Sequence, residues 1–116
     1  MTDLRLLVIE DSDDDAELLL LELTRCGYRC EATRVTTREG LREALGSAAF
    51  DIVLSDYRLP QFTGSEALAE VRAHDRHLPF IVVSGTIGEE LAVDLIRAGA
   101  NDYVMRSEER RCRERV

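Results

Sequence analysis

Hydrophobic residues gather along this chain in short runs that repeat at regular intervals. Continuous apolar runs occupy residues 4–9, 52–55, 80–84 and 103–105. Runs of this length are typical of strands in a parallel sheet that is covered on both faces. A fifth segment, residues 29–35, alternates polar and apolar positions, which favours an edge strand with one exposed face. The pattern therefore predicts five strands.

The segments between these strands carry apolar residues at helical spacing. Apolar positions at i, i+3, i+4 and i+7 form one face of an amphipathic helix. The residues that follow this spacing, wholly or in part, are Ala16, Leu19, Leu20 and Leu23; Leu41, Ala44, Leu45 and Ala48; Leu68 and Val71; and Leu91, Ala92, Leu95 and Ile96. Strict alternation of strand and helix predicts an α/β fold with a doubly wound parallel sheet and right-handed crossovers.

Several of the predicted helix ends carry recognisable capping residues. A threonine followed three residues later by a glutamate matches the capping box, in which two otherwise unpaired amides are satisfied. The three matches are Thr36 with Glu39, Thr63 with Glu66, and Thr86 with Glu89. Gly27 and Gly99 stand where a helix commonly ends in a left-handed residue.

Composition narrows the class of protein. At 116 residues, with 45% hydrophobic and 33% charged residues, the chain is expected to form a single globular domain spanning residues 1–116. Its net charge of −8 argues against direct binding of nucleic acid. No apolar run approaches the roughly 20 residues that cross a bilayer, and the N-terminus lacks the pattern of a signal peptide. We therefore expect no membrane insertion and a cytoplasmic location.

The ends of the predicted strands carry the residues with candidate chemistry. The first strand ends in Glu10 and Asp11, the third in Asp56, the fourth in Ser84 and the fifth in Arg106. Because the carboxyl ends of parallel strands lie at one edge of the sheet, where ligands bind in such folds, these side chains are expected to converge. Each alone has a simpler explanation, since an acid after a strand is commonly a cap or turn residue; only their joint placement indicates a site.

Three converging carboxylates repel one another unless a proton or a cation compensates them. Mg²⁺ prefers oxygen ligands and retains several waters, so Asp11 and Asp56 with a backbone carbonyl suffice to hold it, and Glu10 can act through a bound water. An aspartate can also act as a nucleophile toward phosphorus. The neighbouring acids Asp13, Asp14 and Asp15 most simply favour the positive N-terminus of the first helix.

Four motifs together resemble one known family. The segments "VIEDS", "DIVLSDYRLPQFTG", "IVVSG" and "RAGANDYVM" are similar to those of the receiver domains of response regulators in two-component signalling, the CheY-like family. The resemblance covers residues from about 4 to 106. It implies a flavodoxin-like sheet of five parallel strands in the order 2-1-3-4-5.

The resemblance also implies roles for individual residues. Asp56 would be the phosphoryl acceptor. Glu10 and Asp11 would form the acidic pair, with Asp11 as a direct Mg²⁺ ligand, and the backbone carbonyl of Arg58 would complete the protein ligands. Gly64 would shape the loop after the acceptor.

The last two strands would carry the switch. The hydroxyl of Ser84 would turn to the phosphoryl group, and Tyr103 would be the aromatic residue that turns inward on activation. The phosphoryl donor would be a histidine kinase or a histidine phosphotransfer protein. Such a domain assists its own phosphorylation and dephosphorylation and is not an enzyme acting on a free metabolite.

Arg106 departs from the family pattern, which places a lysine at this position. Arginine keeps the charge and can bind phosphate through two parallel bonds, but it is longer and planar. Two interpretations follow: Arg106 replaces the lysine in a working switch, or the chain is a degenerate receiver that binds partners independently of phosphorylation. A third hypothesis, an aspartate-nucleophile phosphatase, would require a second acid where Arg58 stands.

The tail departs as well. Residues 107–116 offer only Cys112 and Val116 as an apolar pair at helical spacing, so we expect a short or frayed fifth helix that leaves one sheet face thinly covered. That face is open either to a second copy of the chain in a homodimer or to further chain.

Overall fold

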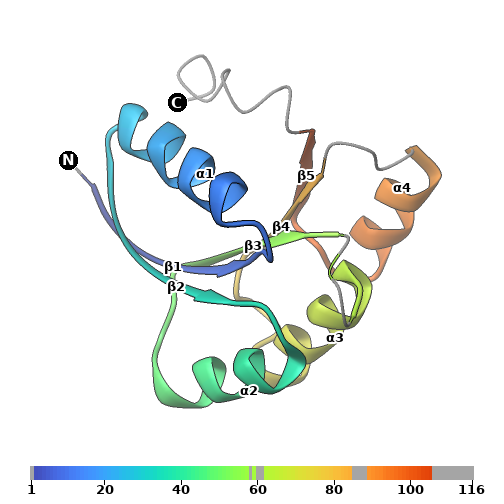
Figure 1. Cartoon of the computed structure of the whole chain (residues 1–116). Coiled ribbons are helices and arrows are strands. Elements are labelled where there is room, and N and C mark those ends of the chain that lie inside the picture. The colour runs from blue at the N-terminus through green and yellow to red at the C-terminus, as the bar shows by residue number, and fades with distance from the viewer. Residues whose placement is uncertain (1, 58, 60–61, 85–88, 106–116) are drawn as a thin grey trace.

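The computed structural model describes residues 2–57, 59, 62–84 and 89–105. Strands and helices alternate along the whole of this part, as the hydrophobic pattern predicts (Figure 1). The elements are β1 (Thr2–Ile9), α1 (Asp13–Arg25), β2 (Tyr28–Val35), α2 (Arg38–Ser47), β3 (Ile52–Asp56), α3 (Gly64–His74), β4 (Phe80–Ser84), α4 (Glu89–Arg97) and β5 (Asp102–Met105). The predicted fifth helix falls on residues that lie outside the described part.

The strands form one parallel sheet in the order β2-β1-β3-β4-β5. This order and the parallel pairing confirm the predicted fold class. β2 lies at an edge of the sheet, and its exposed residues outnumber its buried ones, as its alternating sequence predicts. The chain reverses its direction of winding at β1 and β3, whose carboxyl ends lie side by side. In doubly wound sheets, this reversal is where ligands bind.

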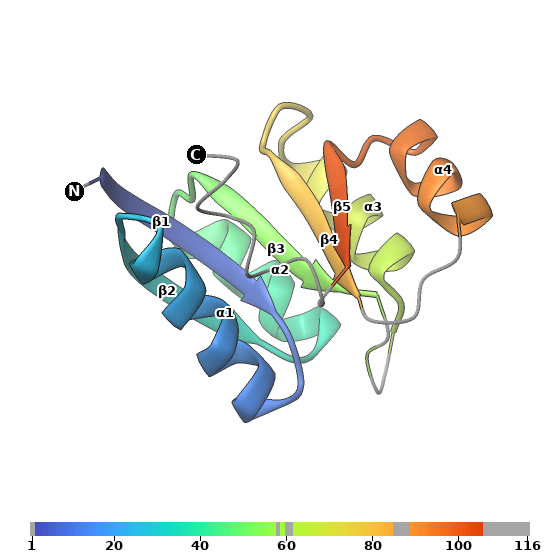
Figure 2. The same cartoon turned by 90° about the horizontal axis from the view of Figure 1, so that it is seen from above.

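Helices cover the sheet on two sides. α1 lies on one face, and α2 and α3 lie on the other (Figures 1 and 2). Successive residues of β1 supply both layers, because side chains alternate along a strand: Leu6 and Val8 pack in the cluster with Ala16 of α1, and Leu7 and Ile9 pack in the cluster with α2 and α3. Leu95 joins the second of these clusters, so α4 contributes to the α2–α3 side.

The helix caps agree with the sequence in part. Thr63 and Glu66 form the complete capping box at the start of α3. The prediction for α2 was wrong by one residue: Thr37, not Thr36, is the cap, and its side chain accepts a hydrogen bond from the amide of Gly40. The third predicted box, at Thr86, begins outside the described residues.

Both predicted helix-ending glycines have positive φ angles, 97° at Gly27 and 117° at Gly99. The predicted apolar face of α4 holds less well, since Leu95 is buried but Ile96 is 41% exposed. Across the part of the chain that the structure describes, we find no helix with the length and apolar character needed to cross a bilayer.

Candidate functional site

The register of the sheet brings two acids to the same level. Ile9 of β1 pairs with Ser55 of β3, so the next residue on each strand, Glu10 and Asp56, stand side by side where the strands end. Asp11 follows Glu10 directly, in the loop that leads to α1. The convergence expected from the sequence therefore rests on parallel pairing between adjacent strands.

The three carboxylates lie close enough to bind one cation together. Carboxylate oxygens of Glu10, Asp11 and Asp56 all lie within 4.8 Å of one another. Glu10 is only 4% exposed, Asp56 is half-buried and Asp11 is exposed. The amide of Ser12 donates a 3.1 Å hydrogen bond to Oε1 of Glu10, which fixes that side chain against the start of α1.

This donor set fits a hard divalent cation. It consists of oxygen atoms only, it is open to solvent at Asp11, and its negative charges are crowded in a partly buried space. A cation of the Mg²⁺ type takes such oxygen ligands and keeps waters in its remaining positions. The site thus has the chemistry that the sequence predicts for Glu10, Asp11 and Asp56.

The remaining predicted site residues are placed by their backbone or not at all. Asp56 pairs with Val83 of β4, so Ser84 lies one residue further along the neighbouring strand than the predicted acceptor. Ser84 in turn pairs with Met105, and Tyr103 pairs with Val82. Both predicted switch residues thus lie on β4 and β5, the two strands that follow β3 in the order of the sheet.

Two predicted residues, Arg58 and Arg106, lie outside the described residues. The backbone carbonyl of the first and the side chain of the second therefore remain predictions.

Two residues that the sequence did not single out also contact the site. Arg34, near the end of β2, donates hydrogen bonds to the backbone carbonyls of Glu10 and Asp11. The buried hydroxyl of Ser55 donates to the carbonyl of Asp56 at 2.9 Å. For Arg34, the sequence offered one indication of a role at the site, namely an arginine at the end of the strand beside β1. Ser55 lies within an apolar run, and nothing in the sequence indicated its contact.

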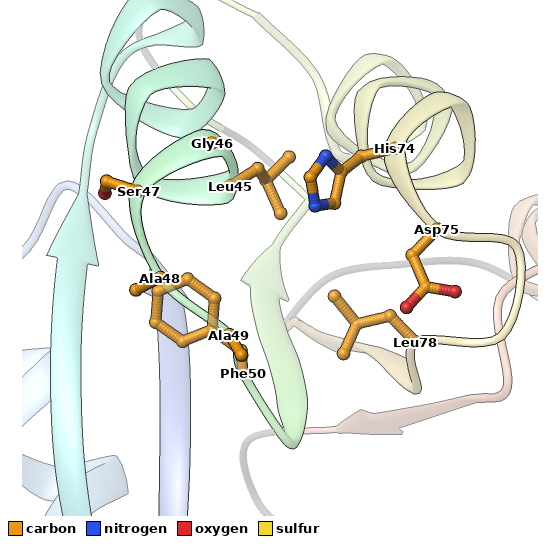
Figure 3. Close-up of a pocket in the computed structure, with 9 residues that line it drawn as sticks. All are labelled: Leu45, Gly46, Ser47, Ala48, Ala49, Phe50, His74, Asp75 and Leu78. Atoms are coloured by element: carbon orange, nitrogen blue, oxygen red, sulfur yellow. The ribbon is translucent and has the colours of Figure 1, made fainter.

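A pocket of about 420 Å³ lies at the opposite end of the sheet (Figure 3). Its walls come from the last turns of α2 and α3 and from the connections that follow them, with Leu45 and Phe50 on one side and His74 and Leu78 on the other (Figure 3). Because these segments precede β3 and β4 in the chain, the pocket is separate from the three acids, which follow β1 or end β3.

The sequence matches the model of the response regulator receiver domain over residues 6–115. The chain belongs to this family. Among its curated relatives, the receiver is 30% identical to the regulatory protein AtoC of Escherichia coli over 102 residues, covering 88% of this chain and 22% of AtoC. It is 26% identical to the chemotaxis protein CheY of Thermotoga maritima, covering 88% of this chain and 84% of that one. The receiver thus spans about a fifth of AtoC and most of CheY.

Solved structures agree with the assignment. A response regulator from Chloroflexus aurantiacus superposes with a TM-score of 0.83 at 27% identity, covering 98% of this receiver and 94% of that chain. The receiver domain of the sensor histidine kinase PA1611 from Pseudomonas aeruginosa gives a TM-score of 0.76 at 26% identity, covering 98% and 97%. In that structure a magnesium ion is coordinated in the active site cleft. Receivers of this family bind Mg²⁺ at an acidic pocket and interact with histidine kinases and phosphotransfer proteins.

Proposed function

We propose that Asp56 accepts a phosphoryl group from a histidine kinase or a histidine phosphotransfer protein in the cytoplasm, and that this phosphorylation changes which partners the receiver binds. The observation that carries the proposal is the cluster of Glu10, Asp11 and Asp56, whose carboxylate oxygens lie within 4.8 Å of one another at the switch point of the sheet. Of these three acids, the half-buried Asp56 is the one that lies on β3, the central strand of the sheet.

The transfer is a displacement at phosphorus. One carboxylate oxygen of Asp56 forms a bond to phosphorus while the bond from phosphorus to the donor's imidazole nitrogen breaks. That nitrogen leaves with its electron pair and takes up a proton. Hydrolysis returns the receiver to its unphosphorylated form. Water attacks the same phosphorus, the bond from phosphorus to the Asp56 oxygen breaks, and inorganic phosphate leaves the free Asp56 carboxylate. The receiver assists only these two reactions on itself.

The other acids prepare the site for a dianionic group. Asp11 and Asp56 would hold Mg²⁺ directly, with the backbone carbonyl of Arg58, and Glu10 would hold it through a water. When bound, Mg²⁺ supplies positive charge that offsets the carboxylates and the phosphoryl oxygens. The hydroxyl of Ser84, one residue beyond the acceptor in the sheet register, would donate to a phosphoryl oxygen, and Tyr103 would change its packing in response.

The cation contributed by Arg106 decides between a full and a degenerate switch. Moving a two-state equilibrium from 1:99 to 99:1 requires about 5.5 kcal/mol, and one hydrogen bond to a charged group contributes about 1.5–3 kcal/mol. A serine hydroxyl alone is therefore too weak, so a backbone amide and a cation would have to act together with it. Arg106 supplies the charge where the family places a lysine; if its shape does not suit the site, the receiver binds partners without responding to phosphorylation.

Incubation of the 116-residue chain with phosphoramidate and Mg²⁺, followed by intact-mass spectrometry, tests the proposal. We expect a gain of one phosphoryl group that is lost in Asp56→Asn and when Mg²⁺ is removed with a chelator. Asp51→Asn is the matched control, because it changes the same residue type directly before β3, at the end of the strand away from the three acids, and it should label normally. Absence of labelling in the unaltered chain, or equal labelling of Asp56→Asn, would refute the proposal.

Arg106→Lys separates the two forms of the function. If the arginine limits switching, the lysine variant should label faster or bind its partner with a larger response to phosphorylation. Equal behaviour of the two chains would indicate that Arg106 replaces the lysine fully. Partner binding that is the same in the unaltered chain and in Asp56→Asn would favour the degenerate receiver.

A further inference from the structure

Arg34 stands beside the acidic site without belonging to it. It is the next-to-last residue of β2 and pairs with Val8, two residues before Glu10 on the adjacent β1. Its side chain is 32% exposed. From this position the guanidinium reaches past the end of β1 and along the loop that carries the acids.

Each nitrogen of the guanidinium has a different partner. Nε donates to the backbone carbonyl of Glu10 at 2.8 Å, and Nη2 donates to the backbone carbonyl of Asp11 at 2.8 Å. Nη1 pairs with the carboxylate of Asp13 in the first turn of α1. One planar side chain thus holds two consecutive peptide groups and the helix that follows them. The rigid fork of arginine suits this task, and a single ammonium group cannot reproduce it.

The contacts to the acid pair are made to backbone oxygens. The bonds from Arg34 to Glu10 and Asp11 end on their carbonyls, and its one carboxylate partner, Asp13, lies outside the three-acid cluster. Those two bonds therefore fix the backbone positions of Glu10 and Asp11 and leave their carboxylate oxygens available to a cation. A second contact supports the same loop, since the amide of Glu10 donates to the carbonyl of Val35 at 3.3 Å.

We propose that Arg34 is a positioning residue for the Mg²⁺ site: it holds the loop of residues 10–12 against the first turn of α1, so that Glu10 and Asp11 face Asp56. The proposal rests on the proposed function only in that the three acids bind Mg²⁺. Residues that orient metal ligands through hydrogen bonds commonly change metal affinity about 10- to 100-fold when they are replaced. Because Arg34 is partly exposed and water can replace some of its bonds, we expect a loss near tenfold.

The sign of the effect distinguishes positioning from simple electrostatics. A positive charge near three carboxylates repels an incoming cation, so removal of that charge alone would strengthen Mg²⁺ binding. Loss of the fork would weaken it. Arg34→Ala removes both the charge and the fork, whereas Arg34→Lys keeps the charge and removes the fork. Positioning predicts weaker binding in both variants; electrostatics alone predicts tighter binding in the first and no change in the second.

The experiment is a calorimetric titration of the purified chain with MgCl₂, with urea unfolding measured on each variant. Arg34→Ala and Arg34→Lys should each bind Mg²⁺ about tenfold more weakly than the unaltered chain. Arg29→Ala is the matched control: it removes an arginine from the same strand, where its partner is Asp3 at the far end of β1, and its affinity should not change. Asp13→Asn keeps both carbonyl bonds and should shift the affinity less than either Arg34 variant.

The possible outcomes are separable from those of the proposed function. If the unaltered chain binds no Mg²⁺, or if Asp11→Asn binds Mg²⁺ as tightly as the unaltered chain does, the assignment of the metal site is wrong. If Asp11→Asn abolishes binding but Arg34→Lys binds as the unaltered chain does, the positioning role is overturned while the site stands. Should Arg34→Ala fail to fold, the lysine variant, which retains the charge and most of the aliphatic stem, decides the question alone.

Discussion

At the scale of single residues, Gly64 has the least room for a side chain among the glycines that the structure describes. It is buried at the start of α3, and its amide donates to the carbonyl of Tyr57 at 2.8 Å. A Cβ atom at this position would lie 2.9 Å from Cα of Tyr57 and 3.3 Å from the carbonyl oxygen of Asp56. The glycine is required by lack of space, since its φ angle is not positive.

Gly64→Ala should therefore destabilise the receiver and slow its phosphorylation. The added methyl group must displace backbone next to Asp56, and overpacking of this kind costs about 1–3 kcal/mol. Gly46→Ala is the control, because a Cβ there meets nothing within 4 Å and alanine favours a helix by up to about 1 kcal/mol over glycine. Urea unfolding should show opposite signs for the two variants, and phosphoramidate labelling should slow only in the first. Equal stability of the two would contradict the steric argument.

The residues of the candidate site differ in how far the sequence alone could predict them. Glu10, Asp11 and Asp56 could be predicted because each follows an apolar run, and parallel pairing brings strand ends together whatever the loops do. Arg34 could not be predicted in the same way. Its role depends on the reach and direction of a long side chain across the neighbouring strand, and spacing along the chain carries no information about either.

At the scale of elements, α2 and α3 are joined by two ion pairs on their outer surface. Arg38 pairs with Glu66, and Arg42 binds Glu70 through two bonds of 2.7 and 2.8 Å. The partners are four residues apart on each helix, which places them one turn apart along the contact. The hydrogen bond from Arg42, aided by its charge, lowers the pKa of Glu70 below its ordinary value.

This shift predicts a pH dependence of stability. A carboxyl whose pKa is lower in the folded chain stabilises the fold above its unfolded pKa, about 4.3 for glutamate, and loses that contribution as the pH falls through the folded value. Glu70→Gln should thus be less stable than the unaltered chain at pH 7, and the difference should shrink as the pH falls from about 5 towards 3. Exposed pairs contribute little, so the loss at pH 7 will be small.

Urea unfolding at several pH values measures this difference. Glu43→Gln is the matched control, since Glu43 lies exposed on α2 and pairs with no cation among the residues described. Its difference from the unaltered chain should change less over the same range. A Glu70→Gln difference that persists unchanged at pH 3 would exclude the ion pair as its source.

Element boundaries were predictable where local chemistry and packing agree. The box of Thr63 and Glu66 holds because both bonds form within one turn. At α2 the pattern pointed to Thr36, but adjacent threonines offer the same hydroxyl and the structure uses Thr37. Which of the two caps the helix depends on how the loop after β2 meets the sheet, a property of tertiary packing.

At the scale of the whole molecule, the buried clusters on the two sides of the sheet differ in size among the residues that the structure describes. The cluster on the α2–α3 side draws buried residues from β1, β3 and β4 and from α2, α3 and α4, whereas on the α1 side only Leu6, Val8, Ala16 and Leu54 form the buried cluster within the described residues. The other apolar residues of α1 that pack there, Leu19, Leu20 and Leu23, are half-buried. Leu18 and Leu21 are 55% and 46% exposed.

A matched pair of truncations should measure this inequality. Leu41→Ala on α2 removes a side chain with no exposed surface and should cost about 3–5 kcal/mol of the free energy of unfolding, because the cavity it leaves cannot collapse fully. Leu20→Ala on α1 removes a half-buried side chain at a rim that water already reaches, so it should cost about 1–1.5 kcal/mol. Both values follow from urea unfolding of the same 116-residue chain. Equal costs would mean that α1 is covered in solution by a second copy or by another segment, and a concentration dependence of the Leu20→Ala cost would identify the copy.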